Sequence, residues 1–556
     1  MGQACCLRPP TVGQFLRWTR LARGGWVTLR VDGMQPELTR SDCTDGLSAV
    51  RSEDQEPSPS APNSTQQTKW LRWAAFLLVA LLGLTLRLPQ LGERPMHTDE
   101  AVNAYIVGQL LAGQPFIYDP HDRHGPLLAA LALPLVRVQG AKTFSDLTEA
   151  QLRMTSVLAG SVTILLFAAG VEMYGFLPCL IAALLFAFAP LPVYYDRYFI
   201  HESLFVAATF GLMLSGWHAL ERRSLSYSSL AGVCAALMLA SKETAVLHFV
   251  GLAVAAFIYW LWNLLGKAPA GWWQPKATLL AAAVFLLLTV TLFTWFGRNW
   301  NALPMLLQAV PNFLQRAHGE GHQAPSWYYL RLVTGGWSGP LMFFLACIGF
   351  FQAVKRRVPS PFAFLALYVA FIAIIYSSIP YKTPWLTLNL WLPATLLVGL
   401  ALEWIWRVTA KYAALRIVCA LMGALAVISI FHDTRQRVFV DPTGEANPYA
   451  YAHTSEDLLG LPTEIDRLAR QSSIASPRIA VIAADPWPLP WYLRHDAEVG
   501  FWQPDHPPGP QPGDADFYIT STESADQYAE LLKDLRPQFF GVRPGVLILL
   551  WSPAPK

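Results

Sequence analysis

The chain has 556 residues, of which 53% are hydrophobic and only 14% are charged. A soluble domain normally carries about 25% charged residues, so this composition argues against a soluble protein and favours a polytopic membrane protein. The net charge of +3 is too small and too dispersed to indicate nucleic-acid binding, and no nucleic-acid partner is expected. The 21 Trp and 19 Tyr residues are typical of aromatic belts that anchor helices at headgroup level.

Residues 1–69 are predicted to form a disordered cytoplasmic tail, because they are rich in Ser, Pro, Gln and Asp and lack a sustained apolar period. The first six residues, from Met1 to Cys6, resemble a myristoylation site but lack Ser or Thr at position 6. Met34 is an alternative start of translation. The N-terminus carries no convincing signal peptide.

Residues 70–431 alternate apolar runs with short polar joints, which predicts a mainly α-helical membrane domain. A stretch at 125–138 is apolar but too short to span, so it is expected to be re-entrant or interfacial. The stretch at 226–241 is also short and is expected to be tilted or half-buried. The eleven predicted spans are 71–91, 151–172, 176–195, 198–220, 226–241, 244–265, 277–297, 328–351, 361–379, 384–406 and 412–431.

Basic residues in the joints indicate the orientation, because inner loops carry an excess of Lys and Arg. With the N-terminus inside, the inner flanks collect Lys69, Arg72, Arg222, Arg223, Lys267, Lys276, Lys355, Arg356, Arg357, Arg407, Lys411 and Arg416. This assignment places the loop at 92–150 and the region after residue 431 on the outer face. The expected location is the plasma (inner) membrane, with the functional site facing the extracytoplasmic side.

Residues 432–556 are predicted to form a small α/β domain on the outer face. Short buried strands are expected at Arg478–Ala483, Asp516–Thr520 and Val546–Trp551, and an amphipathic helix at Ser524–Leu535. The aromatic run Pro486–Tyr492 has two explanations. It is either a rigid turn that packs this domain on the membrane or a surface that faces a sugar or lipid.

Ionisable residues gather at the outer ends of the predicted spans, although charge near a bilayer is costly. The loop after the first span holds a carboxylate pair and three histidines, His97, His121 and His124. Several carboxylates and cations on one face are a plausible active site for a phosphate-bearing substrate. The other residues at this face are Asp99, Glu100, Asp196, Arg197, His201, Glu202, Lys242, Glu243, Arg298 and Lys382.

Each of these groups also has a structural explanation. Asp99 and Glu100 could form a helix N-cap with a favourable dipole contact. Arg197 and Glu202 could pair with one another at a helix end. Lys242 could snorkel from a capped helix start, and Lys382 could anchor a span at the interface. The histidines could bind a metal, but no HxxxH or comparable spacing exists, and loop histidines more often only form hydrogen bonds.

Six short motifs together resemble the GT-C superfamily of polytopic glycosyltransferases, which use polyprenyl-phosphate-linked sugars. This superfamily includes protein mannosyltransferases and lipid A aminoarabinose transferases. More narrowly, the order and spacing of the motifs are similar to a prokaryotic branch described as flippase-activity-associated. The resemblance covers roughly residues 70–500. The motifs are His97–Ala101, His124–Pro126, Tyr195–Tyr198, Ser241–Thr244, Lys382–Trp385 and Trp487–Arg494.

The resemblance implies roles for individual residues. Asp99 would be the catalytic base, with Glu100 as the second catalytic carboxylate or as a residue that orients the site. Arg197, Lys242, Lys382 and His124 would bind the substrate and its lipid phosphate. Glu202 and His201 would hold a divalent cation, although Glu202 stands where the superfamily more often has Asp. The cofactor is otherwise unknown.

The resemblance predicts a glycosyltransferase that moves a sugar, with inversion, from a polyprenyl-phosphate donor to an extracytoplasmic glycan, lipid or protein. The alternative is a non-catalytic accessory or flippase-associated protein for lipid-linked sugars. Transporters tend to show paired halves with broken helices, and no internal repeat is visible here. A purely structural membrane protein would leave the cluster of ionisable residues unexplained.

Overall fold

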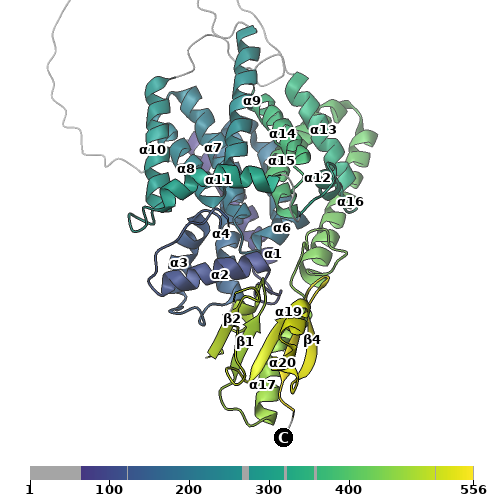
Figure 1. Ribbon diagram of the computed structural model, residues 1–556. Helices are drawn as coiled ribbons and strands as arrows, with labels where there is room; N and C mark the ends of the chain where they lie inside the picture. Colours follow the sequence, from purple (N-terminus) through teal and green to yellow (C-terminus); the bar gives the residue numbers. More distant parts are fainter. Residues whose placement is uncertain are drawn as a thin grey trace, which may run out of the picture. The chain divides into compact units, whose positions relative to one another are not determined.

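The computed structural model describes residues 64–121, 123–265, 274–317, 322–355, 360–496, 498–506 and 509–554. Residues 1–63, and with them most of the predicted cytoplasmic tail and both candidate starts, lie outside the described residues. The first half of the described chain is helical (Figure 1). Its helices are α1 (Ser64–Arg87), α2 (Thr98–Leu111), α3 (Leu127–Val138), α4 (Glu149–Tyr174), α5 (Phe176–Phe188), α6 (Pro190–Asp196), α7 (Glu202–Arg222), α8 (Leu225–Ser241), α9 (Ala245–Leu265), α10 (Pro275–Phe293) and α11 (Ala302–Ala317).

The helical part continues to residue 435 and includes the 3-10 turn Pro384–Leu386. Its remaining helices are α12 (Tyr328–Val333), α13 (Gly339–Lys355), α14 (Pro361–Ser378), α15 (Thr387–Val408) and α16 (Ala413–Arg435). In the described part of the chain, eight helices are long and apolar enough to cross a membrane, or nine if α5 and α6 are one span bent by 59°. The helices α8 and α13 are apolar but shorter. The prediction of a mainly helical polytopic membrane protein is confirmed.

The predicted span at 328–351 differs from the structure, because it is broken into α12 and α13. Gly336 lies in the break with a φ of +78°, a conformation that residues with a Cβ rarely adopt.

The outer faces of the bundle remain apolar. Leu286 and Leu287 on α10 and Leu421 and Ile428 on α16 are all exposed. Exposed apolar faces of this kind fit contact with lipid chains.

The C-terminal region folds around a five-stranded sheet with the order β2-β1-β3-β5-β4, in which β1 pairs in parallel with β2 and β3, and β5 pairs antiparallel with β3 and β4. The three predicted strands are present, whereas β2 and β4 were not predicted. The predicted helix Ser524–Leu535 is two short helices instead, interrupted at Tyr528. The elements are α17 (Leu461–Gln471), β1 (Arg478–Ile482), α18 (Leu489–Tyr492), β2 (Glu498–Trp502), β3 (Phe517–Ser521), α19 (Thr522–Gln527), α20 (Ala529–Leu532), β4 (Arg536–Arg543) and β5 (Val546–Ser552).

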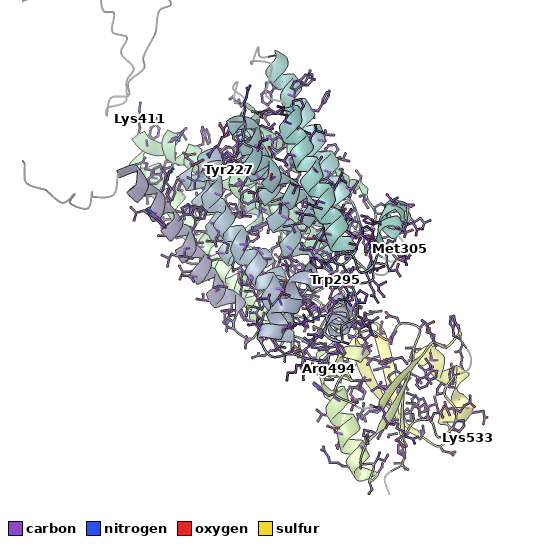
Figure 2. The ribbon with its side chains drawn as sticks, turned by 90° about the vertical axis from the view of Figure 1, so that its left-hand side faces the viewer. Tyr227, Trp295, Met305, Lys411, Arg494 and Lys533 are labelled. Carbon is purple, nitrogen blue, oxygen red and sulfur yellow. The ribbon has the colours of Figure 1, made fainter. Side chains whose placement is uncertain are left out.

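The loop between α1 and α2 is attached to both parts of the protein. The hydroxyl of Tyr492 accepts a hydrogen bond of 2.9 Å from the main-chain N–H of Met96, and the Thr454 hydroxyl donates to the Met96 carbonyl oxygen at 2.7 Å. Arg494 and Lys533 lie at the opposite end of the molecule from Lys411, which is in the joint between α15 and α16 (Figure 2). The α1–α2 loop and the C-terminal sheet therefore share one end of the helical bundle.

Two buried arginines fix this end of the bundle. Arg153 of α4 contacts both carboxylate oxygens of Glu100 at 2.8 and 2.9 Å, and it also donates to main-chain carbonyl oxygens between Leu91 and Pro95. Arg87, at the end of α1, contacts Asp196 at 2.8 Å, and both side chains are fully buried. Each ion pair joins segments that lie far apart in the sequence. The pairs therefore determine where the α1–α2 loop sits.

We expect Glu100→Gln to lower the free energy of unfolding by about 3–5 kcal/mol, because it leaves the Arg153 guanidinium buried without a countercharge. The free energy can be measured by SDS titration in mixed micelles. Glu530→Ala, which removes half of an exposed ion pair with Lys533, is the control and should change little. Equal losses in the two variants would contradict a structural role for Glu100.

Candidate active site

Asp99 and Glu100 begin helix α2, and the start of this helix explains why their side chains diverge. His97 is the N-cap, and its ring accepts a hydrogen bond from the main-chain N–H of Asp99 at 3.1 Å. Glu100 completes a capping box by accepting from the N–H of His97 at 3.1 Å. The predicted alternative, in which the carboxylate pair caps a helix, is therefore correct only in part: Glu100 takes part in the capping box, but His97 is the N-cap. Because adjacent helical side chains point about 100° apart, Asp99 is directed elsewhere.

The Glu100 carboxylate is fully occupied by other groups. It is buried, it pairs with Arg153, and it accepts a further hydrogen bond of 2.8 Å from the N–H of Phe199. Burial alone would raise the pKa of Glu100, but the charge and hydrogen bonds of Arg153 outweigh it and lower the pKa to about 2. Glu100 lines neither of the two cavities described below. Its geometry is that of a residue that holds the loop.

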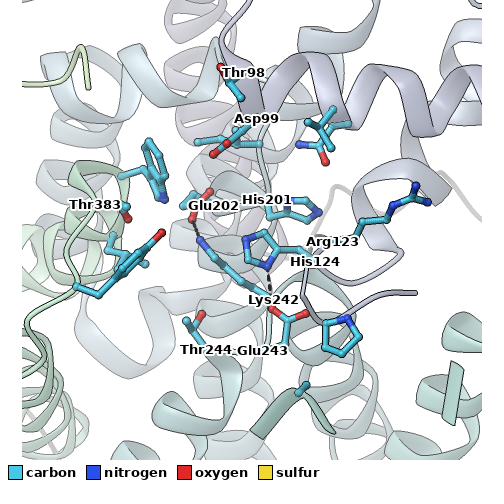
Figure 3. A pocket seen from close by; sticks show the side chains of 18 of the residues that line it. Thr98, Asp99, Arg123, His124, His201, Glu202, Lys242, Glu243, Thr244 and Thr383 are labelled. Atoms are coloured by element: carbon cyan, nitrogen blue, oxygen red, sulfur yellow. Dashed lines mark hydrogen bonds and ion pairs between the residues drawn. The ribbon is translucent and has the colours of Figure 1, made fainter. Parts of the chain in front are cut away.

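Asp99 is exposed and lines a cavity of about 360 Å³ at this end of the bundle (Figure 3). The cavity walls include α2, the loop before α3, the start of α7, the joint between α8 and α9, the turn before α15, and Asp485 and Trp487. Its polar side chains include Thr98, Asp99, Arg123, His124, His201, Glu202, Lys242, Glu243, Thr244 and Thr383. The cavity thus brings together several residues predicted for the site. Its apolar side chains, such as Val102, Ile106, Leu247 and Leu386, suit a substrate that is part lipid.

Lys242 and Glu202 form a buried ion pair in the wall of this cavity. Burial would lower the pKa of Lys242, but the nearby Glu202 carboxylate raises it overall, so the ammonium keeps its charge. Lys242 also lies 6.0 Å from the centre of the Trp385 ring. The predicted pairing of Arg197 with Glu202 is wrong, because Glu202 contacts Lys242. The predicted snorkelling of Lys242 is also wrong, because its side chain is buried.

A second pair of ionisable side chains, His124 and Glu243, lies beside Lys242 (Figure 3). His124 Nδ1 is 2.8 Å from a Glu243 carboxylate oxygen, and the Tyr118 hydroxyl donates to the other oxygen at 2.9 Å. The pKa of the Glu243 carboxyl would be raised by burial, but the His124 contact lowers it overall. The His201 ring packs against His124 with centroids 5.2 Å apart. Burial holds the pKa of His201 well below 6.5, so its imidazole is neutral.

A second cavity of about 350 Å³ is also lined by Asp99. It shares Thr98, Asp99, Tyr381, Thr383, Trp385 and Asp485 with the first cavity. Its own lining residues are His97, His322, Tyr451, Ala452 and Arg543. Asp485 also borders both cavities, but its carboxylate is 3.4 Å from the Arg543 guanidinium. Asp99 is therefore a carboxylate between two cavities and carries no ion pair within the described residues.

Two of the predicted phosphate-binding residues lie outside both cavity linings. Arg197 donates to the main-chain carbonyl oxygens of Leu86, Arg87, Pro89 and Gln90, after the end of α1. The Lys382 ammonium is buried and donates to the carbonyl oxygens of Ser377 and Ile379 at the end of α14. Both cations compensate carbonyl groups that a helix end leaves unpaired.

The described residues form no preassembled three-ligand metal site. The part of the chain that the structure describes contains no group of three or more His, Cys, Asp or Glu side chains that could hold one. Glu202, one of the two predicted ligands, is paired with Lys242, and His201 packs against His124. A zinc ion normally needs at least three protein ligands. Mg²⁺ is often held by one or two carboxylates and substrate phosphates, so the predicted divalent cation stays a prediction.

Several cavity residues were not predicted. Glu243 was placed at this face, but only Lys242 of its motif was given a role. Asp485 immediately precedes the aromatic run and was not considered. Arg543 carried no signal in the sequence. The aromatic run itself proves to be mainly a packing element: Trp491 is buried and donates to Glu149 at 2.8 Å, whereas Trp487 lines the first cavity.

Comparison with known proteins identifies the fold. Residues 131–295 match the family model described as dolichyl-phosphate-mannose-protein mannosyltransferase. The structure is similar to that of ArnT from Cupriavidus metallidurans bound to undecaprenyl phosphate, with a TM-score of 0.57 and 17% identity over 87% of this chain and 98% of that one. It is also similar to the archaeal oligosaccharyltransferase AglB from Archaeoglobus fulgidus in complex with an inhibitory peptide and a dolichol-phosphate. For that pair the TM-score is 0.54, with 14% identity over 87% of this chain and 74% of the other.

At the level of sequence, no curated protein is significantly similar to the chain. The fold of this protein is that of the GT-C glycosyltransferases, as the resemblance implied. The narrower likeness to the flippase-activity-associated branch remains a prediction. The family match includes Glu202, Lys242 and Glu243 but begins after Asp99.

We expect a thermodynamic coupling between Glu202 and Lys242. Lys242→Met should destabilise the protein because it leaves Glu202 charged and buried, and Glu202→Gln should do the same for Lys242. The double variant should lose less than the sum, with a coupling of about 1–3 kcal/mol. The free energies of unfolding in SDS titrations measure this coupling. Additive losses would show that the two side chains do not interact.

Proposed function

We propose that this protein is a membrane glycosyltransferase that transfers a sugar from a polyprenyl-phosphate donor to a hydroxyl group of an extracytoplasmic glycan, lipid or protein. The observation that carries the proposal is the position of Asp99 between two cavities, one of which contains Lys242 and His124. A transferase needs such a carboxylate between its donor and its acceptor. The complexes of ArnT with undecaprenyl phosphate and of AglB with dolichol-phosphate support a donor of this class.

In this proposal the first cavity binds the donor. The Lys242 ammonium has three N–H donors and uses one on Glu202, so others can reach phosphate oxygens. His124, whose Nδ1 contacts Glu243, supplies a further N–H through Nε2 when it is an imidazolium. These charge-assisted contacts would strengthen as the departing phosphate gains negative charge, which favours the transition state over the bound donor. The apolar wall residues would contact the first part of the lipid.

Asp99 acts as the general base. As the acceptor oxygen forms its bond to the anomeric carbon, its proton moves to the Asp99 carboxylate, and the bond from that carbon to the phosphate oxygen breaks. The products are the glycosylated acceptor and the polyprenyl phosphate. A single displacement by the acceptor inverts the configuration at the anomeric carbon. This displacement requires one catalytic carboxylate. Glu100 is not available as a second one, because it is paired with Arg153.

The remaining predicted residues act by positioning. Glu100, Arg197 and Lys382 hold main-chain segments around the cavities, and Glu202 holds Lys242. His201 packs beside His124 as a neutral ring. Arg197 and Lys382 support phosphate binding through the loops that they hold, rather than through a direct contact.

An accessory protein for lipid-linked sugars, without catalysis, is the alternative. It would also need a binding site for a lipid phosphate. It would not need a carboxylate between that site and a second cavity. The position of Asp99 at the border of both cavities therefore favours catalysis. The accessory function instead predicts near-normal glycosylation with Asp99→Asn.

Asp99→Asn should reduce sugar transfer by about 10²–10⁴-fold, since this is the typical effect of losing a general base. Asp485→Asn, which changes another carboxylate that borders both cavities, is measured for comparison. The control is Glu530→Gln, which changes an exposed carboxylate outside both linings. The readout is mass spectrometry of glycans and glycolipids in a deletion strain complemented with each variant. Binding of undecaprenyl phosphate to the purified variants verifies that each one is folded.

Near-normal products with Asp99→Asn would overturn the role of Asp99 and move the accessory function ahead. A larger loss with Asp485→Asn than with Asp99→Asn would transfer the role of base to Asp485. Loss of undecaprenyl phosphate binding in both variants would indicate a folding defect. Asp99→Ser and Asp485→Ser would then replace the two asparagine variants.

The cavities should face the extracytoplasmic side of the plasma (inner) membrane, because basic residues gather at the other end of the bundle. In a cysteine-free background on intact cells, an impermeant thiol reagent should label Ser145→Cys and Asp514→Cys. It should label Lys411→Cys only after the cells are opened. The reverse pattern would place the site in the cytoplasm.

A further inference from the structure

The second cavity has a wall of aromatic and imidazole rings. The Trp385 ring lies 6.1 Å from the rings of both His97 and Tyr451, measured between centroids. The His322 ring continues the wall, with its centroid 5.4 Å from that of Tyr451 and 5.0 Å from that of Tyr381. Most of these rings meet edge to face, an arrangement that aromatic pairs prefer. Five rings thus form one connected surface.

Hydrogen bonds fix the rings in place. The His97 Nε2 atom is 3.1 Å from the main-chain oxygen of Tyr451, and the His322 ring contacts the Tyr451 hydroxyl. The main-chain N–H of Lys382 donates to the carbonyl oxygen of His322 at 3.1 Å, which joins the loop at 322–324 to the loop that carries Tyr381. Because the rings are held by contacts from separate segments, the wall is preorganised for a ligand.

The second cavity is also lined by polar side chains. Arg543 is within 3.5 Å of the Thr98 hydroxyl and 3.4 Å of Asp485, and Asp99 is beside Thr98. The described lining therefore contains two carboxylates and one guanidinium. Burial lowers the pKa of His322, so its ring is uncharged at neutral pH. The cavity carries no excess of positive charge.

We propose that this second cavity binds a sugar ring of the acceptor, so that the protein glycosylates a saccharide. The apolar face of a sugar, with its C–H bonds, packs on aromatic rings, while Asp485 and Arg543 accept from and donate to its hydroxyl groups. One hydroxyl of the bound sugar would then face Asp99. This inference rests on the proposed function for the identity of the acceptor, but the binding of a saccharide can be measured without any donor.

The lining argues against an anionic acceptor and against a lipid acceptor. An anionic acceptor would meet the carboxylates of Asp99 and Asp485, and the single guanidinium of Arg543 already contacts Asp485. A lipid acceptor would need an apolar wall like that of the first cavity. A wall of rings with a few planar polar groups at its edge suits a neutral saccharide best.

The test is saturation-transfer NMR on the whole protein in nanodiscs, titrated with methyl glycosides of glucose, galactose and mannose. At least one glycoside should bind saturably. Tyr451→Ala should weaken its binding by about tenfold, because it removes a ring from the centre of the wall. Tyr451→Phe keeps the ring and should stay within about threefold of the parent. Tyr412→Ala, which removes an exposed ring from the joint after α15, is the control.

Undecaprenyl phosphate binding is measured in the same samples and separates the two proposals. It should be unchanged in Tyr451→Ala, which also verifies that this variant is folded. If undecaprenyl phosphate binds and no glycoside does, or if Tyr451→Ala binds glycosides normally, the saccharide site is wrong and the proposed function stands. If a Ser/Thr peptide binds in competition at this site and no glycoside does, the acceptor is a protein. If glycosides bind and undecaprenyl phosphate does not, the donor part of the proposed function fails instead.

Discussion

The Arg153 guanidinium is the group on which the geometry of the site depends. Its side chain extends from α4 into the buried end of the bundle. There it contacts the carbonyl oxygens of Leu91, Arg94 and Pro95 and both carboxylate oxygens of Glu100. One guanidinium can contact these five oxygen atoms only if the α1–α2 loop follows one path. That path places the N-terminus of α2 at the edge of the cavities. Burial makes any other arrangement costly, because a guanidinium or a carboxylate without a partner is strongly disfavoured there.

The charged residues at this end of the bundle therefore fall into two groups that the sequence does not distinguish. Arg87, Arg153 and Arg197 bind main-chain oxygens and buried carboxylates, and they determine the shape of the loops. Lys242 and His124 each have one carboxylate partner and still border open volume, so they can contact a ligand. Arg has five N–H groups in a rigid plane and suits the first task, whereas Lys keeps free donors after making one contact and suits the second.

The sequence was sufficient for the membrane architecture and for the end of the bundle where the ionisable groups meet, because both follow from hydrophobic runs and from the joints between them. It could not separate Asp99 from Glu100 by composition, since their difference arises from a partner 53 residues away on α4. For the same reason Arg197 was expected at a phosphate, although it compensates the carbonyl groups after α1. Strands β2 and β4 were missed because Glu498–Trp502 has a glycine at its centre and much of Arg536–Arg543 is exposed, so neither shows a clean apolar pattern.

The two cavities share six lining residues and differ in the others, and this has a consequence for specificity. Glu202, Lys242 and Glu243 line only the first cavity and lie within residues 131–295, the range that matches the mannosyltransferase family model. The second cavity takes Tyr451, Asp485 and Arg543 from the C-terminal region, which is fastened to the α1–α2 loop through Met96. Substitutions in the C-terminal region can therefore reshape the second cavity while Lys242 and His124 keep their partners. This arrangement fits the proposed transfer from one class of donor to different acceptors. Asp99, in the first turn of α2, borders both cavities and carries no ion pair within the described residues.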